Sequence, residues 1–219
     1  MEKTKYFTEN NLQNKSDSWL KKIDKKISLH SDRIDISKLV LLILDMQKFF
    51  HDENSHAFIP SAKAIINPII QLASIFNEHN RPIILTKHIN TTDNAKMMDY
   101  WWRDILTEDS KYSNLIPAIE EIQNTDLIVK SQYDAFYKTK LDEILQKDKI
   151  EQVVITGVMT NLCCETTARS AFVHGYNIFF PIDGTATYNS KLHKSSLLNL
   201  AHGFANITTI SKLIDSINE

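Results

Sequence analysis

Three side chains that can act together in covalent catalysis stand beside three apolar runs of the sequence. Asp45 follows the run 39–44, Lys130 closes a second run, and Cys163 opens a helix-like segment after a third. A cysteine attacks as its thiolate, and a free thiol titrates at about pH 8.5, so Cys163 needs activation. A helix N-terminus lowers the pKa of such a thiol, a carboxylate can accept its proton, and an ammonium group favours both anions. The three residues are therefore candidates for a nucleophile, an acid–base group and an electrostatic partner.

Each of these residues also has a purely structural interpretation. A single aspartate after a strand is commonly a turn or cap residue, a lysine at a strand end commonly extends to solvent, and a free cysteine is commonly an inert core residue. Ligands of open parallel sheets, however, bind beyond the carboxyl ends of the strands, where residues far apart in the sequence converge. Whether the three residues form one site therefore depends on whether the elements that carry them are strands of one parallel sheet.

Apolar strand-like runs alternate with helix-like segments along the chain. The pattern predicts strands at 39–44, 82–86, 127–130, 152–156, 177–181 and 207–210, and helices at 61–80, 138–147, 165–174 and 190–202. Ser61 is the expected N-cap of the first helix, and Gly175 is the expected C-cap of the third. This alternation predicts an α/β fold with three layers, αβα, around a doubly wound parallel sheet of about six strands.

Composition excludes several classes of partner. The chain has 219 residues, which suits one domain, and its 25 basic and 27 acidic side chains give a net charge of −2. This balance gives no electrostatic basis for binding nucleic acid or an anionic membrane. The longest aliphatic run is too short to cross a bilayer, and the polar N-terminus does not resemble a secretory signal. The two cysteines are neighbours and make no disulfide framework, so we expect a reduced, cytoplasmic protein.

The first 37 residues form a charged arm that stands apart from a domain spanning residues 38–219. Within the arm, Trp19, Ile23 and Ile27 recur every four residues, which predicts a short amphipathic helix. We expect the arm to pack on its own domain or on a neighbouring subunit, and partial disorder is the alternative.

The sequence around the three candidate residues resembles the isochorismatase-like hydrolases. The first motif of that family is similar to 44–50, the second to 129–136, and the third, which is the most specific, to 156–169. A later Asp-Ala-x-Ala segment is similar to 183–187, with Gly184 in place of an alanine. The resemblance runs from about residue 38 to residue 210 in the right order, and it leaves the arm uncovered.

The resemblance implies roles for individual residues. It implies that Asp45, Lys130 and Cys163 form the catalytic set, and that a cis peptide bond lies between Val158 and Met159. The N–H groups of Met159 and Cys163 would then form an oxyanion hole. The residues expected to line the substrate pocket are Gln47, Phe50, Trp102, Tyr137 and Leu162.

Members of this family divide by chemistry. One branch cleaves C–N bonds through a thioester, and the retained Cys163 favours that branch. The other branch hydrolyses a vinyl ether with the aspartate as general acid, and it often has glycine in place of the cysteine. The aromatic segment 100–102 and Cys164 resemble features of that second branch, so it remains an alternative. A catalytically degenerate binding protein is the other alternative.

No metal and no cofactor are expected. The nicotinamidases of the family begin their metal site with Asp-x-His, whereas this chain has Thr86-Lys87-His88, and a further expected histidine falls on Asn94. One histidine cannot hold a metal ion, so the sequence argues against a metal-dependent nicotinamidase. The expected partner is a small-molecule substrate, and the family implies a homo-oligomer.

Overall fold

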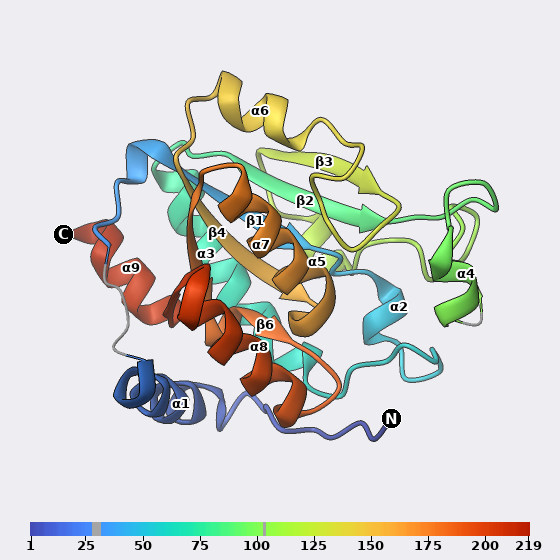
Figure 1. Ribbon diagram of the computed structural model, residues 1–219, viewed down its shortest axis with the longest axis horizontal. Coiled ribbons are helices and arrows are strands. Elements are labelled where there is room, and N and C mark those ends of the chain that lie inside the picture. The colour runs from blue at the N-terminus through green and yellow to red at the C-terminus, as the bar shows by residue number, and fades with distance from the viewer. Residues whose placement is uncertain (28–31, 103) are drawn as a thin grey trace.

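A parallel sheet forms the centre of the computed structural model, which describes residues 1–27, 32–102 and 104–219 (Figure 1). Its order is β3-β2-β1-β4-β5-β7, with the short β6 paired to β4. All pairings within these strands are parallel. The strands are β1 (Leu39–Leu44), β2 (Ile83–His88), β3 (Thr125–Lys130), β4 (Gln152–Val158), β5 (Asn177–Pro181), β6 (Thr185–Ala186) and β7 (Asn206–Thr208).

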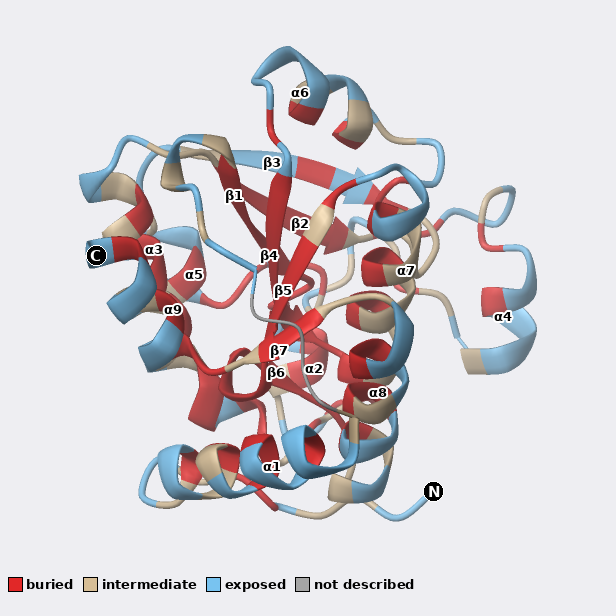
Figure 2. Cartoon of the chain, turned by 60° about the vertical axis from the view of Figure 1, so that its left-hand side comes forward, coloured by how far each residue is buried: buried red, intermediate tan, exposed pale blue. Residues whose placement is uncertain are grey.

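Helices cover both faces of the sheet. The helices α3, α5 and α9 lie on one face, and α7 and α8 lie on the other (Figure 2). The α-helices are α1 (Leu12–Ile27), α2 (Lys48–His51), α3 (Ile66–Glu78), α4 (Met97–Trp102), α5 (Pro117–Glu120), α6 (Leu141–Lys147), α7 (Glu165–Val173), α8 (Ser190–Gly203) and α9 (Ile210–Asn218). The shorter helical turns are η1 (Ile36–Lys38), η2 (Ala62–Ile65), η3 (Thr160–Cys164) and η4 (Ile182–Gly184). The predicted three-layer αβα fold is confirmed.

Several elements differ from the sequence prediction. The helices α2, α4, α5 and α9 were not predicted, and the strand predicted at 207–210 is Asn206–Thr208, with Ile210 beginning α9. The short strand β6 was not expected, because two residues are too few to give a periodic signal. Ser61 does not cap the helix that follows it, since its hydroxyl accepts hydrogen bonds from the backbone N–H groups of Tyr6 and Phe7 instead. The reason is tertiary: the N-terminal arm passes over this turn and supplies the donors.

The central strands are buried along their whole length. All six residues of β1 and all seven of β4 are buried, which explains the absence of polar alternation in the sequence. Gly157 lies where these two strands come closest, with a φ of +107°. A Cβ on Gly157 would lie 2.1 Å from the carbonyl oxygen of Leu44, so only glycine fits.

The N-terminal arm packs against the helices and turns that flank the sheet. In α1, Trp19, Leu20 and Ile23 are buried, and the helix lies against α8 and η4. The Trp19 ring packs edge-on against His193 of α8, with 5.5 Å between ring centroids. The described part of the arm therefore belongs to the core of its own chain, while residues 28–31 lie outside the described residues. None of the helices described is both long and apolar enough to span a membrane.

Candidate active site

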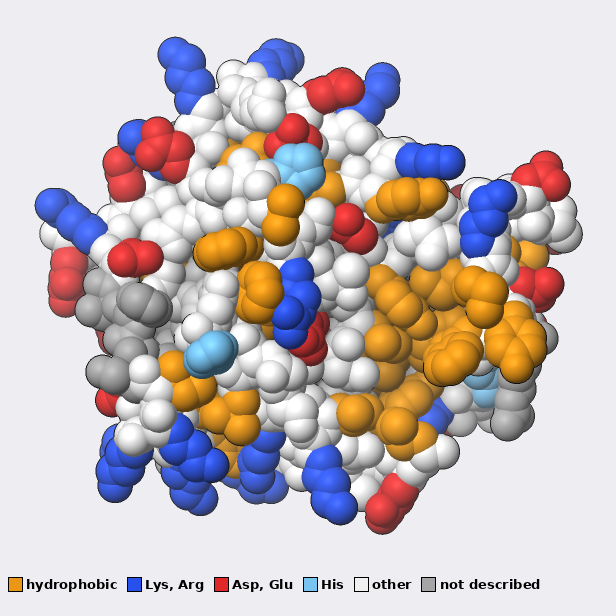
Figure 3. Space-filling model, viewed as in Figure 1, with side chains coloured by type: hydrophobic (Ala, Val, Ile, Leu, Met, Phe, Trp, Pro, Cys, Tyr) orange, Lys and Arg blue, Asp and Glu red, His pale blue; other side chains and the backbone are white. Residues whose placement is uncertain are grey.

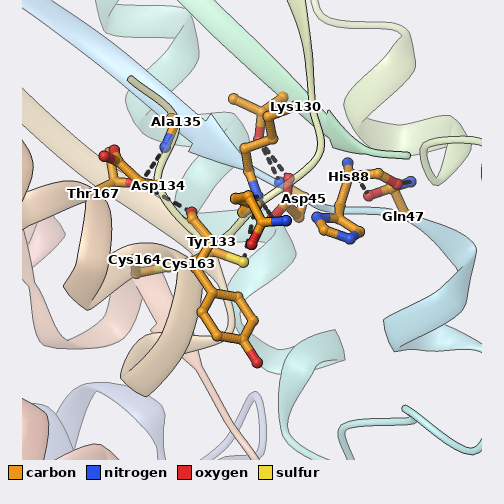
Figure 4. Close-up of polar contacts among 12 residues, drawn as sticks. Asp45, Gln47, His88, Lys130, Tyr133, Asp134, Ala135, Cys163, Cys164 and Thr167 are labelled. Carbon is orange, nitrogen blue, oxygen red and sulfur yellow. Dashed lines mark hydrogen bonds and ion pairs between the residues drawn. The ribbon is translucent and has the colours of Figure 1, made fainter. Parts of the chain in front are cut away.

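The carboxyl ends of the strands bring the three candidate residues together, as Figure 4 shows. Asp45 directly follows β1, Lys130 ends β3, and Cys163 lies in η3 beyond β4. The ammonium group of Lys130 lies 2.7 Å from Oδ2 of Asp45 and 3.4 Å from Sγ of Cys163. It also donates to the carbonyl oxygen of Gln132 at 3.0 Å. Lys130 is therefore a bridge between the carboxylate and the thiol, and it does not extend to solvent.

The backbone and the neighbouring strand hold Asp45 in place. Its φ is +53°, in the left-handed region that an aspartate enters more easily than most residues. Its backbone N–H donates to the carbonyl oxygen of Thr86, at 3.2 Å, and to the hydroxyl of the same residue, at 3.1 Å. That hydroxyl donates in turn to Oδ1 of Asp45 at 2.6 Å. Both carboxylate oxygens thus face a donor inside a fully buried site.

Burial and charge set the protonation states of this group. Burial acts to raise the pKa of Asp45, but the Lys130 ammonium group brings the pKa below its ordinary value. Burial also acts to lower the pKa of Lys130, yet Asp45 and Cys163 raise it overall. The resting site therefore holds a carboxylate and an ammonium group.

The pKa of the Cys163 thiol differs from the sequence expectation. Burial raises the pKa of Cys163 to about 12, with Asp45 acting in the same direction and Lys130 against it. The expected lowering of the pKa is not found, because Cys163 is only 5% exposed and burial has the largest influence on the pKa of its thiol. Asp45 and Cys163 are within hydrogen-bonding reach of each other, so a neutral thiol faces an ionised acceptor.

The turn that carries Cys163 is a single π-helical turn, η3, before α7. The peptide bond between Val158 and Met159 is cis, and the carbonyl oxygen of Met159 accepts from the N–H groups of Leu162 and Cys164. Cys164 is fully buried, and its thiol points to the carbonyl oxygen of Thr156 in the core. The two adjacent cysteines therefore have different surroundings.

A small cavity lies directly in front of Cys163. Its volume of about 30 Å³ has room for a water or two, and most of its lining is apolar or aromatic. The lining residues are Phe49, Phe50, His88, Asn90, Met98, Trp102, Asp104, Leu106, Tyr133, Met159, Leu162 and Cys163. Phe50, Trp102 and Leu162, three of the expected pocket residues, are among them.

The other two expected pocket residues do not line the cavity. Gln47 is fully buried, and its side-chain amide is occupied by backbone groups, donating to Ser113 at 2.7 Å and accepting from the N–H of His88 at 2.8 Å. Gln47 therefore holds the end of β2 in place and does not face the cavity. Tyr137 is 43% exposed and lies outside the lining, since the chain after β3 directs its ring to the surface.

Several lining residues are not among the five pocket residues that the resemblance implied, although the sequence had already marked His88 as a pocket or core residue. The Tyr133 hydroxyl accepts from the indole N–H of Trp102 at 2.9 Å, and the ring of His88 faces Oδ1 of Asn90 at 2.8 Å. Asp104 forms an ion pair with His56, if that ring is protonated. His88 ends β2 and Asn90 follows it, at the same sheet edge as the ends of β1 and β3. Their position at the end of a predicted strand is the sequence feature that could have identified them as site residues.

Around α4, which contributes Met98 and Trp102 to the cavity, apolar side chains gather on the surface (Figure 3). Met97, Tyr100 and Trp101 are 65%, 78% and 70% exposed. A homo-oligomer contact through this patch stays a prediction.

Burial lowers the pKa of His88 to about 4, and the nearby Lys130 charge lowers it further, so the ring is neutral at neutral pH. A neutral imidazole suits a metal ligand, but a metal site needs three or four such groups. Within residues 1–27, 32–102 and 104–219, no cluster of three or more His, Cys, Asp or Glu side chains is placed to hold an ion.

A cysteine, a carboxylate and a lysine gathered at the carboxyl edge of a parallel sheet are a candidate site for nucleophilic hydrolysis. The family model for the isochorismatase domain matches residues 39–212. The chain therefore belongs to the isochorismatase-like hydrolases.

Relatives within this family carry several names. The chain is 37% identical to "Nicotinamidase 3" of Arabidopsis thaliana over 181 residues, which cover 81% of this chain and 87% of that protein. It is 27% identical to "Enterobactin synthase component B" of Escherichia coli K12, over 81% of this chain and 62% of that protein.

Solved structures share the fold. A cysteine hydrolase from Pseudomonas syringae pv. phaseolicola superposes with a TM-score of 0.82 at 23% identity, covering 87% of this chain and 97% of the other. N-carbamoylsarcosine amidase from Thermoplasma acidophilum gives a TM-score of 0.69 at 23% identity, covering 79% and 96%.

Proposed function

We propose that this protein is an amidohydrolase that cleaves a C–N bond of a small metabolite through a thioester on Cys163. The observation that carries the proposal is the position of the thiol, which lines the cavity and lies 3.4 Å from the Lys130 ammonium group. The names of two relatives, a nicotinamidase and an N-carbamoylsarcosine amidase, support amide or carbamoyl chemistry.

The first half-reaction follows from the protonation states. The Cys163 thiol transfers its proton to Asp45 as its sulfur attacks the carbonyl carbon, and the N–H groups of Met159 and Cys163 hold the developing oxyanion. Protonated Asp45 then gives the proton to the departing nitrogen, the C–N bond breaks, and ammonia or an amine leaves. Lys130 stays cationic throughout and favours the charged forms of both partners.

The second half-reaction reverses these roles. Asp45, again a carboxylate, accepts a proton from a water molecule as that water attacks the thioester carbonyl. The C–S bond breaks, the proton returns to the sulfur, and the carboxylic acid is released. The net reaction consumes one water for each C–N bond cleaved.

The apolar and aromatic lining favours a small, largely uncharged substrate. Because the cavity holds only a water or two, side chains of the lining must move to admit even a single ring. Nicotinamide is the first compound to test, since a relative is named for it. A carbamoyl compound is the second, because the metal ligands expected of nicotinamidases are not at Thr86 and Asn94.

An isochorismatase-type vinyl ether hydrolase is the alternative, and the position of Trp102 in the cavity wall favours it. That reaction needs Asp45 as a general acid and no thiolate. The two mechanisms predict opposite responses to Cys163→Gly. An amidase should lose about 10³-fold or more in kcat, whereas an isochorismatase should retain its turnover.

The experiment is a screen with nicotinamide, carbamoyl compounds and isochorismate, followed by intact-mass spectrometry with the slowest amide substrate. We expect an acyl adduct on the peptide that contains Cys163, and no adduct on Cys163→Gly. If the glycine variant hydrolyses isochorismate at the wild-type rate and no adduct forms, the covalent proposal is wrong. If the wild-type chain turns over none of these compounds and Cys163 is no more reactive to iodoacetamide than Cys164, a binding role replaces the catalytic one.

A further inference from the structure

A tyrosine of the N-terminal arm makes polar contacts that lead toward the candidate active site. Tyr6 lies outside the residues that match the family model, yet its side chain is only 6% exposed. Its hydroxyl has two partners, the ring Nδ1 of His193 at 2.8 Å and the backbone N–H of Thr187 at 3.0 Å. Its backbone is fixed as well, because its N–H donates to the hydroxyl of Ser61. The arm thus holds one phenol group at a defined point of the core.

The donors fix the direction of these hydrogen bonds. The N–H of Thr187 can only donate, so the oxygen of Tyr6 accepts from it and the phenol proton is directed to Nδ1 of His193. His193 is fully buried, and burial lowers its pKa to about 3, so the ring is neutral. Its own proton then lies on Nε2, which faces the hydroxyl of Thr185 at 3.4 Å. Every polar atom of this group has a partner.

The same group reaches the turn that carries the nucleophile. The hydroxyl of Thr187 donates to Oδ1 of Asn161, which lies in η3 between Met159 and Cys163. Thr187 is fully buried, so this hydroxyl has no competing solvent. The backbone of Thr187 is thus held by Tyr6 while its side chain holds η3.

We infer that Tyr6 is a positioning residue, which fixes Thr187 and, through the contact of Thr187 with Asn161, the turn that presents Cys163. Lys130 lies 3.4 Å from the thiol and Asp45 is within hydrogen-bonding reach of it, so a shift of η3 weakens both interactions. The expected effect of Tyr6 on catalysis rests on the proposed function, whereas its expected effect on the reactivity of Cys163 does not.

The test is Tyr6→Phe, which removes the hydroxyl and keeps the ring in the core. We expect the second-order rate constant for alkylation of Cys163 by iodoacetamide to fall about 2- to 10-fold, as one lost hydrogen bond implies. With an amide substrate, kcat should fall by a similar factor while KM changes less. The side-chain amide resonance of Asn161 should move in the ¹H–¹⁵N spectrum.

Thr187 supplies the second arm of the experiment. Thr187→Ala removes the hydroxyl that contacts Asn161 and should reproduce the slower alkylation, whereas Thr187→Ser should restore it. The double variant Tyr6→Phe with Thr187→Ala should be no slower than Thr187→Ala alone, because both changes act on one connection.

Tyr176→Phe is the matched control. Tyr176 is 7% exposed, and its hydroxyl donates to Asp142 at 2.7 Å, away from the residues that line the cavity. Its loss should lower the melting temperature without changing the alkylation of Cys163. If Tyr6→Phe behaves in the same way, with alkylation slowed less than twofold or made faster, the hydroxyl of Tyr6 only stabilises the fold and the inference fails. A chain that alkylates as expected but hydrolyses no amide would instead contradict the proposed function.

Discussion

The hydroxyl of Thr86 donates to Oδ1 of Asp45 at 2.6 Å, on the carboxylate oxygen that does not pair with the lysine. Thr86 also accepts from the backbone N–H of Asp45 through both its carbonyl and its hydroxyl oxygen. A residue of β2 thus orients the carboxylate that follows β1. Its hydroxyl favours the ionised form of Asp45, since it donates to the charged group.

Removing that hydroxyl should slow catalysis. In Thr86→Val one carboxylate oxygen of Asp45 loses its donor inside a buried site, and hydrogen bonds to charged groups contribute roughly 1.5–3 kcal/mol. We expect kcat to fall about 10- to 100-fold. Thr86→Ser keeps the donor and should retain most of the rate. Equal losses in the serine and valine variants would show that the hydroxyl is not the cause.

The two cysteines should respond oppositely to substitution. Cys163→Ala should abolish hydrolysis, while Cys164→Ala should keep most of it, because the Cys164 thiol points into the core. The measurement is kcat/KM with the best substrate from the screen, together with peptide mapping after iodoacetamide treatment. Labelling of Cys164 at the rate of Cys163 would count against the assignment.

The rate should depend little on pH across the neutral range. Activity requires ionised Asp45, whose pKa lies below its ordinary value. Protonation therefore removes activity only in acid, below about pH 5, and the Cys163 pKa of about 12 leaves the alkaline side flat. A kcat/KM profile recorded from about pH 4 to pH 9 checks this. In Thr86→Val the acid limb of this profile should move to higher pH, because the ionised form of Asp45 loses a hydrogen-bond donor and its pKa rises.

Glycine at position 157 should be essential for folding. Gly157→Ala places a methyl group 2.1 Å from the backbone oxygen of Leu44 at a φ of +107°. We expect a loss of more than about 3 kcal/mol in the free energy of unfolding, measured by urea titration. Gly203→Ala is the control, because nothing lies within 4 Å of its added Cβ, and it should change stability by less than about 1 kcal/mol.

Chelation should leave the enzyme active. Position 86 is a threonine and position 94 an asparagine, and His88 faces Asn90. Activity should survive prolonged EDTA treatment, and elemental analysis should find no stoichiometric zinc, iron or manganese. Loss of activity that returns on adding one of these metals would overturn the expectation.

The sequence by itself determined the sheet and the identity of the candidate catalytic side chains. Uninterrupted apolar runs such as 39–44 predict buried parallel strands, and that periodicity is local information. The motifs around Asp45, Lys130 and Cys163 identify the three residues because their order along the chain is specific.

Only the tertiary structure decided what surrounds those side chains. The pKa of Cys163 depends on how completely the core desolvates it, and a dipole argument from the local turn gives the opposite sign. Gln47 and Tyr137 could not be placed from their motifs, because whether a side chain faces a cavity depends on neighbours distant in sequence. The contacts of the N-terminal arm could not be predicted from the sequence either. Its helical period predicted an amphipathic helix, but the contacts of Tyr6 with Thr187 and His193 join residues more than 180 positions apart.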